Sequence, residues 1–474
     1  MTKLLYTQID DIATRRYNCN IMLKKIVLLV SDVVILYGSL ALTVFIRYGD
    51  RFDKQLDLHL IPFTLIFALW LVVFYISNFY EIQNLKNGAQ FFSAFINSSL
   101  VALLLSIAFF YILPLYGITP KTNLLLFALI FSLLGFMNRF LFNKLFERVF
   151  IKPLVIVGLN NQSLELARFI KSNPQLGYQL THVVDLNPLT EMIEMEFSEF
   201  RIIKGLDGLK EIVEEESINS IVLSPEVYKI PQIINFFYHS LSHRITFYDL
   251  SIFYERTTGM IPLGAINQVW FLENLSEGGK RGYEISKRFI DITLSLIIGI
   301  VSLIFYPVIM MSILLSSKGP IFYTQNRVGR HDKNFRIIKF RTMIVDAEKN
   351  GAVWAKENDM RVTRLGNFMR KTRIDELPQV WNILKGEMSF VGPRAERPEF
   401  HSQLQESVPF FQERYLIKPG LTGWAQINYR YGGSVDDTAV KLKYDLYYIK
   451  NRSLILDLGI ILKTIRIALQ QAGR

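Results

Sequence analysis

The sequence predicts a membrane protein of three parts: an α-helical membrane bundle, a soluble Rossmann-like α/β domain, and a small α/β domain that begins with a re-entrant membrane helix hairpin. Three observations support this fold class. Four apolar runs lie near the N-terminus, alternating strand and helix patterns follow, and a fifth apolar run has basic residues at both ends. We place the parts at residues 1–150, 151–250 and 283–474, with a linker at 251–282.

The composition is that of a membrane protein with a basic surface. Half of the 474 residues are hydrophobic, and the formal net charge is +11. Such an excess of positive charge suits the anionic cytoplasmic lipid surface and phosphate-bearing ligands. We expect no nucleic acid as a partner. Cys19, the single cysteine, excludes an intrachain disulfide and a cysteine-based zinc site.

Each of the four N-terminal runs is long enough to cross a bilayer, which takes about 20 residues of helix. Basic residues precede the first run and follow the last, so the positive-inside rule places both ends of the bundle in the cytoplasm. Asp32 lies inside the first run, where an acid is functional, faces a neighbouring helix or lies near the interface. The runs cover residues 22–46, 58–79, 91–116 and 122–146.

Residues 151–250 show the pattern of a doubly wound α/β domain. The run 154–158 predicts a buried strand that leads into a helix at 163–171. A second strand, at 183–185, ends in an acid, as in nucleotide-binding folds. Further short strands are predicted at 218–223 and 245–250.

The segment after the first of these strands departs from a dinucleotide-binding fingerprint. Only its first glycine, Gly158, is present, and the side chains of Asn160 and Ser163 would crowd a pyrophosphate. Two functions therefore stay open for this domain: nucleotide binding, and scaffolding or dimerisation, which we favour.

The fifth apolar run, at about 289–315, decides the topology of the C-terminal part. Pro307 interrupts it, and lysines and arginines stand at both ends. Positive flanks on both sides favour a helix that enters the membrane, bends at Pro307 and returns to the same side. The alternative is a straight fifth crossing.

The last apolar stripe lies at helical spacing within 454–469 and includes Ile455, Leu458, Ile461 and Ile465. Such a stripe is typical of a core helix. Beside a membrane-embedded hairpin, it is equally typical of a helix lying flat in the membrane interface.

The segment 370–379, RKTRIDELPQ, places two adjacent carboxylates after a basic cluster. Thr372 or Asp375 would be the N-cap of a helix, so that Asp375 and Glu376 lie at its first turn. Free backbone amides at a helix start favour ionised carboxylates and also bind phosphate. On this segment alone, an acidic cap flanked by surface arginines explains the pattern equally well.

Further blocks accompany this segment in a fixed order: GPIFYTQNRVG at 319–329, KFRTM at 339–343, KGEMSFVGPR at 385–394 and KPGLTGWAQIN at 418–428. Together they resemble the bacterial sugar transferase family, the polyprenyl-phosphate hexose-1-phosphate transferases, over about residues 283–470. The N-terminal part resembles the long form of this family, with four added membrane helices. The runs at 392–400 and 428–432 resemble its exopolysaccharide-priming branch.

The resemblance implies an enzyme that transfers hexose-1-phosphate, with glucose or galactose as the hexose, from a UDP-hexose to undecaprenyl phosphate. UMP would be released through a covalent aspartyl-phosphosugar intermediate, as the priming step of exopolysaccharide, capsule or O-antigen synthesis. The resemblance also implies the re-entrant helix and a multi-pass location among the lipids of the bacterial inner membrane, with the catalytic domain on the cytoplasmic side. We expect a homodimer.

This chemistry needs a nucleophile, positive charge for the phosphates and a positioned leaving group. Asp375 is the candidate nucleophile, because a carboxylate can form an acyl phosphate. By the family pattern, Glu376 together with Asp375 would hold Mg²⁺, which suits oxygen ligands and bridges diphosphates. The family's phosphate-binding basic positions are matched by Lys339, Arg341, Arg370 and Arg394.

The alternative to an enzyme is a non-catalytic membrane scaffold that binds sugar nucleotides or assembly partners through residues 153–250. The intact acid pair and the arginines favour the enzyme. A nucleotide-sugar dehydratase would need the glycine fingerprint that is missing here.

Overall fold

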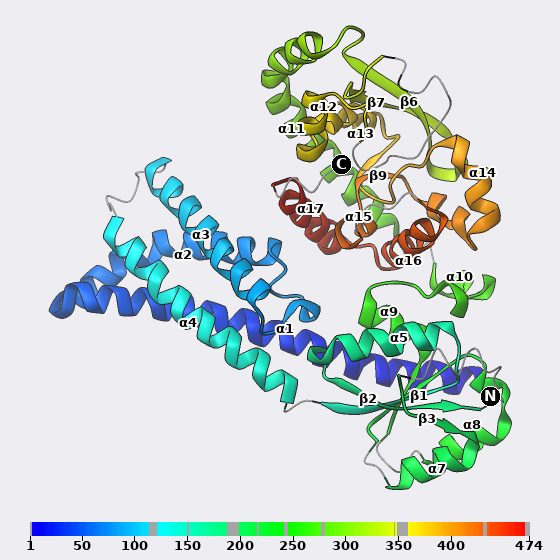
Figure 1. Cartoon of the computed structure of the whole chain (residues 1–474). Coiled ribbons are helices and arrows are strands. Elements are labelled where there is room, and N and C mark those ends of the chain that lie inside the picture. Colours follow the sequence, from blue (N-terminus) through cyan, green and yellow to red (C-terminus); the bar gives the residue numbers. More distant parts are fainter. Residues whose placement is uncertain are drawn as a thin grey trace. The chain divides into compact units, whose positions relative to one another are not determined.

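A computed structural model describes residues 2–112, 121–148, 151–186, 199–215, 218–240, 245–275, 280–345, 347, 359–429 and 434–469. The chain separates into two compact units, Met1–Phe253 and Tyr254–Arg474. Figure 1 shows their elements, coloured along the sequence. Each unit is described by itself below.

Four long helices form the first part of unit 1, as predicted. By length and composition they could cross a membrane. They pack through aromatic side chains: the ring of Trp70 lies 4.8 Å from that of Phe131 and 5.5 Å from that of Phe127, both in edge-on geometry. The helices are α1 (Thr2–Tyr48), α2 (Phe52–Ile76), α3 (Ala89–Ile112) and α4 (Lys121–Arg148).

Asp32 faces a neighbouring helix, one of the three settings considered from the sequence. Its carboxylate pairs with the Arg139 guanidinium of α4 and accepts a hydrogen bond of 2.8 Å from the Tyr80 hydroxyl. Arg139 also donates to the Phe79 carbonyl at 2.8 Å. Both charged side chains are almost fully buried, so each needs the other, and a role in holding α1 against α4 explains the acid.

The second part of unit 1 is the predicted parallel α/β domain. Its five strands lie in the order β3-β2-β1-β4-β5, and all four neighbouring pairs are parallel. This parallel sheet is confirmed, and the Rossmann-like assignment stays a prediction. The strands are β1 (Lys152–Val157), β2 (Tyr178–Asp185), β3 (Ile202–Lys204), β4 (Ser220–Leu223) and β5 (Thr246–Asp249).

Helices cover both faces of this sheet (Figure 1). α7 (Gly205–Glu215) and α8 (Pro231–His239) pack on one face, where their apolar side chains join those of β1 and β4 in one core. α5 (Asn161–Ser172) lies on the other face. Burial of the strands on both sides explains their continuous apolar runs, which made them visible in the sequence.

Unit 2 begins inside α9 (Leu250–Thr258) and includes most of the expected linker. Ile261 is buried in the main core of this unit. Trp270 and Phe271, on α10 (Gln268–Asn274), pack against the same core. The described residues between 254 and 275 are therefore part of the folded unit.

The fifth apolar run forms one helix, α11 (Arg281–Ser316), with Pro307 inside it. The expected bend at Pro307 does not divide the run into two helices, and the re-entrant path stays a prediction. One side of the second half packs on the unit, where Tyr306 and Ile313 join Phe340 in a small core. Most of its other apolar side chains are exposed.

A hairpin and several short segments carry the acid pair. β6 (Phe322–Val328) and β7 (Asn334–Phe340) are antiparallel, in a register that places Tyr323 opposite Lys339. The segments that follow the hairpin are α12 (Arg364–Thr372), the 3-10 helix η10 (Ile374–Gln379), α13 (Val380–Lys385), β8 (Ser389–Val391) and β9 (Gly420–Thr422). The strands β8 and β9 pair in parallel.

The C-terminal helix α17 (Leu454–Leu469) buries only part of the stripe read from the sequence, since Ile461 packs against the main core but three other members do not. Ile455 is 84% exposed, Leu458 58% and Ile465 45%, whereas Ile460 between them is fully buried. The core-helix interpretation of that stripe is therefore wrong at these positions. The remaining elements are α14 (Pro398–Ser407), the 3-10 helix η11 (Phe411–Leu416), α15 (Trp424–Asn428) and α16 (Val435–Asn451).

Candidate functional site

Asp375 and Glu376 lie in η10, directly after an unusual backbone turn. Arg373 has a φ of 58°, in the left-handed region that non-glycine residues rarely adopt. The turn ends α12 and directs the chain into η10. The expected N-cap at Thr372 or Asp375 is therefore wrong, since Arg373 precedes the segment and no side chain caps it.

α12 lies against the segment that follows β7. Its cap is Thr363, whose Oγ1 accepts a hydrogen bond of 2.9 Å from the Gly366 amide. Gly366 allows the close approach, because a Cβ there would lie 2.0 Å from the Thr342 carbonyl oxygen. One turn further on, Arg370 Nε donates to Thr342 Oγ1 at 2.9 Å, which ties the arginine to the end of the hairpin.

The Glu376 carboxylate is buried among three positive side chains. Its Oε1 accepts hydrogen bonds from Lys339 Nζ at 3.0 Å and from Arg394 Nη2 at 2.9 Å. Its Oε2 lies 3.6 Å from Arg373 Nη1. Burial opposes ionisation, but the positive charges outweigh it and hold the pKa of Glu376 well below its ordinary value. Glu376 is therefore a permanent negative charge that gathers cations from three segments.

Asp375 is buried in the same surroundings as Glu376, but its pKa is shifted in the opposite direction. Burial, followed by the negative charge of Glu376, raises the pKa of Asp375 to about 6. Lys339, Arg370 and Arg394 act against this rise. The two acids thus separate into one that stays ionised and one that titrates near neutral pH, a separation that is typical of catalytic pairs.

Two glycines fix the turn that carries Arg394. A Cβ on Gly392 would lie 2.5 Å from the Lys418 carbonyl oxygen, and one on Gly420 would lie 2.1 Å from the Gly392 nitrogen. The Gly420 amide donates to the Pro393 carbonyl at 2.9 Å. The two chains therefore pack backbone to backbone, and this contact aims the following arginine at Glu376.

Most of the basic residues expected from the sequence surround this acid pair. Lys339 and Arg394 contact Glu376, and Arg370 acts on Asp375 through its charge. Arg341 is different: its guanidinium donates to the carbonyls of Ser317 at 2.6 Å and Lys318 at 3.1 Å. Arg341 therefore holds the C-terminal end of α11 against the unit, and its described hydrogen bonds lie outside the acid pair.

Sequence reasoning missed Asn382, which is fully buried on α13. Its Oδ1 accepts from the Ile338 amide at 3.1 Å, and its Nδ2 donates to the Arg336 carbonyl at 2.7 Å. The side chain thus continues the ladder of β7 as another strand would, and it fixes the strand that carries Lys339. A lone amide inside the apolar run 380–384 was the available signal.

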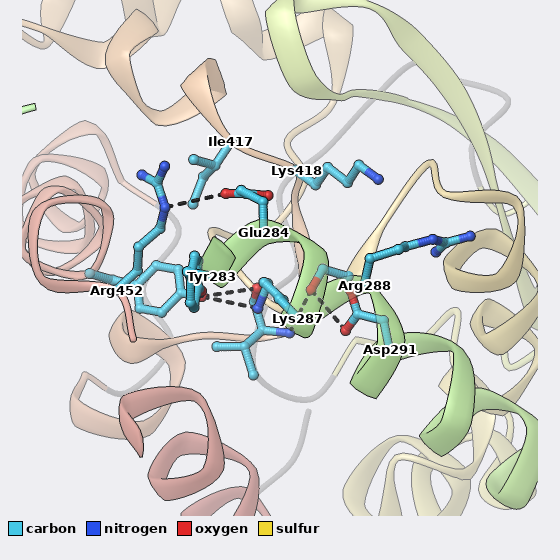
Figure 2. A pocket seen from close by; sticks show the side chains of 11 residues that line it. Tyr283, Glu284, Lys287, Arg288, Asp291, Ile417, Lys418 and Arg452 are labelled. Atoms are coloured by element: carbon cyan, nitrogen blue, oxygen red, sulfur yellow. Dashed lines mark hydrogen bonds and ion pairs between the residues drawn. The ribbon is translucent and has the colours of Figure 1, made fainter. Parts of the chain in front are cut away.

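Charged residues also attach the start of α11 to this unit, around a cavity of about 30 Å³ (Figure 2). Arg288 donates to the Ile383 and Leu384 carbonyls, at 2.6 and 2.7 Å. Asp291 accepts from the Ser389 hydroxyl at 3.1 Å and from the Phe390 amide at 3.0 Å.

Lys287 makes the third attachment, an ion pair of 2.7 Å with Asp457 of α17. The cavity is large enough for one water molecule and too small for a lipid headgroup. Both ends of α11 are therefore fixed to the unit that carries the acid pair, the N-terminal end by these side chains and the C-terminal end by Arg341.

The acid pair offers carboxylate oxygens, which are the ligands that Mg²⁺ prefers. Among the described residues, no group of three His, Cys, Asp or Glu side chains could hold a metal ion. Glu376 Oε2, however, is buried and makes no hydrogen bond. Mg²⁺ is often held by one or two carboxylates plus substrate phosphates, so Asp375 and Glu376 fit Mg²⁺ bound to a diphosphate.

In the α/β domain of unit 1, a side chain caps the start of α5, the helix end at which a phosphate would bind in a nucleotide-binding fold. At the start of α5, Asn160 Oδ1 accepts from the Ser163 amide at 2.8 Å, where a phosphate would otherwise bind. Asn160 Nδ2 donates to the Glu226 carboxylate at 3.1 Å, which adds a negative charge. These contacts weigh against a pyrophosphate at this helix, as the missing glycines predicted.

We predict that Gly366→Ala displaces α12 and destabilises unit 2. The new Cβ would overlap the Thr342 carbonyl oxygen, and overpacking of this kind costs about 1–3 kcal/mol of unfolding free energy. The control is Gly282→Ala, because nothing lies within 4 Å of a Cβ at Gly282. Thermal unfolding in detergent should show a lower midpoint for Gly366→Ala alone. Equal midpoints for the two variants would contradict the packing described here.

Comparison with known proteins gives three informative relatives. An Aeromonas hydrophila UDP-N-acetylgalactosamine-undecaprenyl-phosphate N-acetylgalactosaminephosphotransferase is 46% identical over 194 residues, which cover 40% of this chain and 45% of that protein. A candidate undecaprenyl-phosphate N-acetylgalactosaminyl 1-phosphate transferase of Bacillus subtilis is 50% identical over 140 residues, or 30% of this chain and 78% of that protein. A Xanthomonas campestris UDP-glucose:undecaprenyl-phosphate glucose-1-phosphate transferase is 27% identical over 332 residues, or 67% and 66%.

The chain thus spans less than half the length of the Aeromonas relative. The family model described as bacterial sugar transferase matches residues 282–471, the segment that carries the acid pair and its cations. Together with the match to most of the Bacillus protein, this shows that the chain belongs to the bacterial sugar transferase family.

Proposed function

We propose that this protein transfers a sugar-1-phosphate from a UDP-sugar to undecaprenyl phosphate and releases UMP, as the priming step of a surface polysaccharide. The observation that carries the proposal is a buried aspartate of raised pKa beside a glutamate held by three cations. Such a site supplies a nucleophile and positive charge for a diphosphate at one place. The names of the three relatives agree with this reaction class.

In the first step, an Asp375 carboxylate oxygen attacks the phosphorus that bears the sugar. The bond from this phosphorus to the bridging oxygen breaks, and UMP leaves with the electron pair. The product is an aspartyl-phosphosugar, an acyl phosphate. A carboxylate with a pKa of about 6 is ionised at neutral pH, as a nucleophile must be.

The cations around the pair are suited to the charge of the diphosphate. Arg370 and Arg394 can each present a forked guanidinium to phosphate oxygens, and Lys339 adds a point charge. Glu376 keeps Lys339 and Arg394 near the nucleophile before the substrate binds, and Thr342 Oγ1 holds Arg370, so little reorganisation is needed. When Mg²⁺ is bound, held by Glu376 and Asp375, it would neutralise charge on the diphosphate.

In the second step, a phosphate oxygen of undecaprenyl phosphate attacks the same phosphorus and Asp375 leaves as a carboxylate. The acceptor is a lipid, so the acid pair has to lie near the membrane surface. α11 and the exposed stripe of α17 both offer apolar surface to lipid. The stripe supports the interfacial alternative for α17 that was left open by the sequence.

Both ends of α11 are attached to the unit that carries the acid pair, and this favours re-entry over crossing. Within α11 itself, Asp291 and the Ile313 carbonyl, which accepts from Arg341 Nη2 at 3.5 Å, are 22 residues apart, or about 33 Å of helix. A helix that crossed would carry one of these attachments, and the unit with it, to the other side. We propose that the unit lies on the cytoplasmic side of the inner membrane, where UDP-sugars are made.

The identity of the donor sugar needs a direct test, because the names of the relatives point to different sugars. Two of the relatives reported above are named for N-acetylgalactosamine and one for glucose. We keep glucose and galactose as the proposed hexoses and include their N-acetylated forms in the test. The experiment is to follow UMP release with undecaprenyl phosphate and a panel of these UDP-sugars. Release with none of them would contradict the proposed function and favour a non-catalytic scaffold.

With the donor but no acceptor, we predict that the protein releases about one UMP per site and retains the labelled sugar phosphate. Asp375→Asn removes the nucleophile and should abolish both the UMP burst and the label. Glu406→Gln, an exposed acid of the same unit, is the matched control and should behave as the wild type. An Asp375→Asn variant that is still labelled would show that another group forms the adduct.

We predict a pH dependence of this labelling step, measured without acceptor because the acceptor phosphate itself titrates near pH 6. The pKa of Asp375 is raised to about 6, so its nucleophilic form is present above that pH and is lost below it. At low donor concentration the labelling rate should fall about tenfold per unit below the pKa. A rate that stays constant down to pH 5 would contradict an attacking Asp375 of raised pKa.

We predict that cysteines at the two ends of α11 are labelled from the cytoplasmic side only. Gly282→Cys and Lys318→Cys, both at exposed positions, are placed in a Cys19→Ser background and treated with a membrane-impermeant maleimide. Asp50→Cys, between α1 and α2, should be labelled from outside and is the control. Outside labelling of Lys318→Cys in an active protein would overturn the re-entrant path.

A further inference from the structure

Arg414 is a buried arginine of unit 2 that takes no part in the acid pair itself. It lies in η11 and is 4% exposed. Its Nη2 donates to Asp445 Oδ2 of α16 and to the Arg394 carbonyl, both at 2.9 Å, and its Nη1 donates to Glu396 Oε1 at 3.4 Å. One guanidinium therefore joins α16 to the turn after β8.

A purely structural reason for this arginine is weak. A buried ion pair often contributes less to stability than apolar side chains of the same volume, so its presence calls for another explanation. Burial even raises the pKa of Asp445 to about 6, although Arg414 opposes the rise. Unlike an apolar side chain, the Arg414 guanidinium can donate a hydrogen bond to the Arg394 carbonyl and so fix the position of this backbone group.

That carbonyl belongs to Arg394, whose own side chain reaches the acid pair. Arg394 Nη2 donates to Glu376 Oε1 at 2.9 Å, yet the side chain is 32% exposed, so packing alone does not hold it. Its backbone is held on one side by a bridge to Gly420 and by Arg414 through the carbonyl. These two backbone contacts fix the point from which the Arg394 side chain extends toward Glu376, and Arg414 supplies one of them.

We propose that Arg414, paired with Asp445, is a positioning residue that fixes the Arg394 guanidinium against Glu376 and toward the donor diphosphate. This inference rests on the proposed function for its kinetic consequence and on geometry alone for the coupling of Arg414 to the Arg394–Glu376 pair. Arg414 touches neither Asp375 nor Glu376 in any described contact. It acts through Arg394.

The kinetic test is a double-mutant cycle on kcat/KM for the donor. Arg414→Met combined with Asp445→Leu removes both charges, so that neither is left buried and unpaired. We expect this pair of changes to lower kcat/KM by up to about 100-fold, as small misplacements of a catalytic group do. In an Arg394→Met background, the same two changes should lower kcat/KM little further, because the guanidinium that Arg414 positions is already absent. Additive losses would overturn the proposal.

Two further variants separate positioning from folding. Arg414→Lys keeps the charge beside Asp445 but lacks the fork that binds the carboxylate and the carbonyl together. We expect the unfolding midpoint of Arg414→Lys to stay near the wild-type value while its kcat/KM for the donor falls. Arg452→Met removes another buried arginine, which pairs with Glu284 at 3.4 Å, and its kinetic effect should simply add to that of Arg394→Met. Non-additivity of the Arg452 control as well would show a general loss of structure and contradict a specific role.

A readout that needs no activity distinguishes failure of this inference from failure of the proposed function. The coupling between Glu376 and Arg394 is measured from unfolding midpoints of Glu376→Gln, Arg394→Met and the double variant. We expect this coupling to shrink when Arg414→Met and Asp445→Leu are also present, and to persist with Arg452→Met. Unchanged coupling would overturn the positioning role, whether or not the wild type releases UMP.

Discussion

The Glu376 carboxylate joins three segments of the second unit at the candidate site. Buried charge is tolerated only when it is paired, so this one acid requires Lys339 from the hairpin, Arg373 from the turn after α12 and Arg394 from the turn after β8 to converge. The same convergence sets the field at Asp375, because the neighbouring negative charge and burial raise its pKa while the cations oppose the rise. Structure and electrostatics are therefore hard to separate here, since removing one of these cations would leave a buried charge less well paired and would also change the pKa of Asp375.

The hydrophobic pattern was enough to predict the four N-terminal helices and the parallel sheet, because bilayer-length runs and fully buried strands leave strong signals. The composition around Asp375 and Glu376 likewise predicted a basic cluster. Local conformation was harder: the left-handed Arg373 carries no residue-type signal, so the sequence pointed to a helix cap at Thr372 or Asp375 instead.

The roles of single polar side chains were harder still to predict, because they depend on contacts far along the chain. Arg341 stands two residues from Lys339, yet it binds carbonyls at the end of α11 rather than the acid pair. Asn382 lies on a helix, 42 residues after Phe340, the last residue of β7. Its side chain nevertheless makes the hydrogen bonds that another strand would make to β7. The stripe of α17 shows the same limit, because a helical period gives the apolar side but not whether protein or lipid covers it.

The central claim is that an Asp375 carboxylate oxygen attacks the phosphorus that bears the sugar. Detection of the resulting covalent adduct is the most direct test of this claim. The purified protein is mixed with UDP-glucose, UDP-galactose or an N-acetylated analogue without acceptor, quenched in acid, digested and analysed by mass spectrometry. The account predicts a sugar-phosphate adduct on the peptide containing residues 374–379, located at Asp375, and its loss when undecaprenyl phosphate is added before the quench. A donor that turns over with acceptor while the adduct is absent, or lies on another residue, would contradict it.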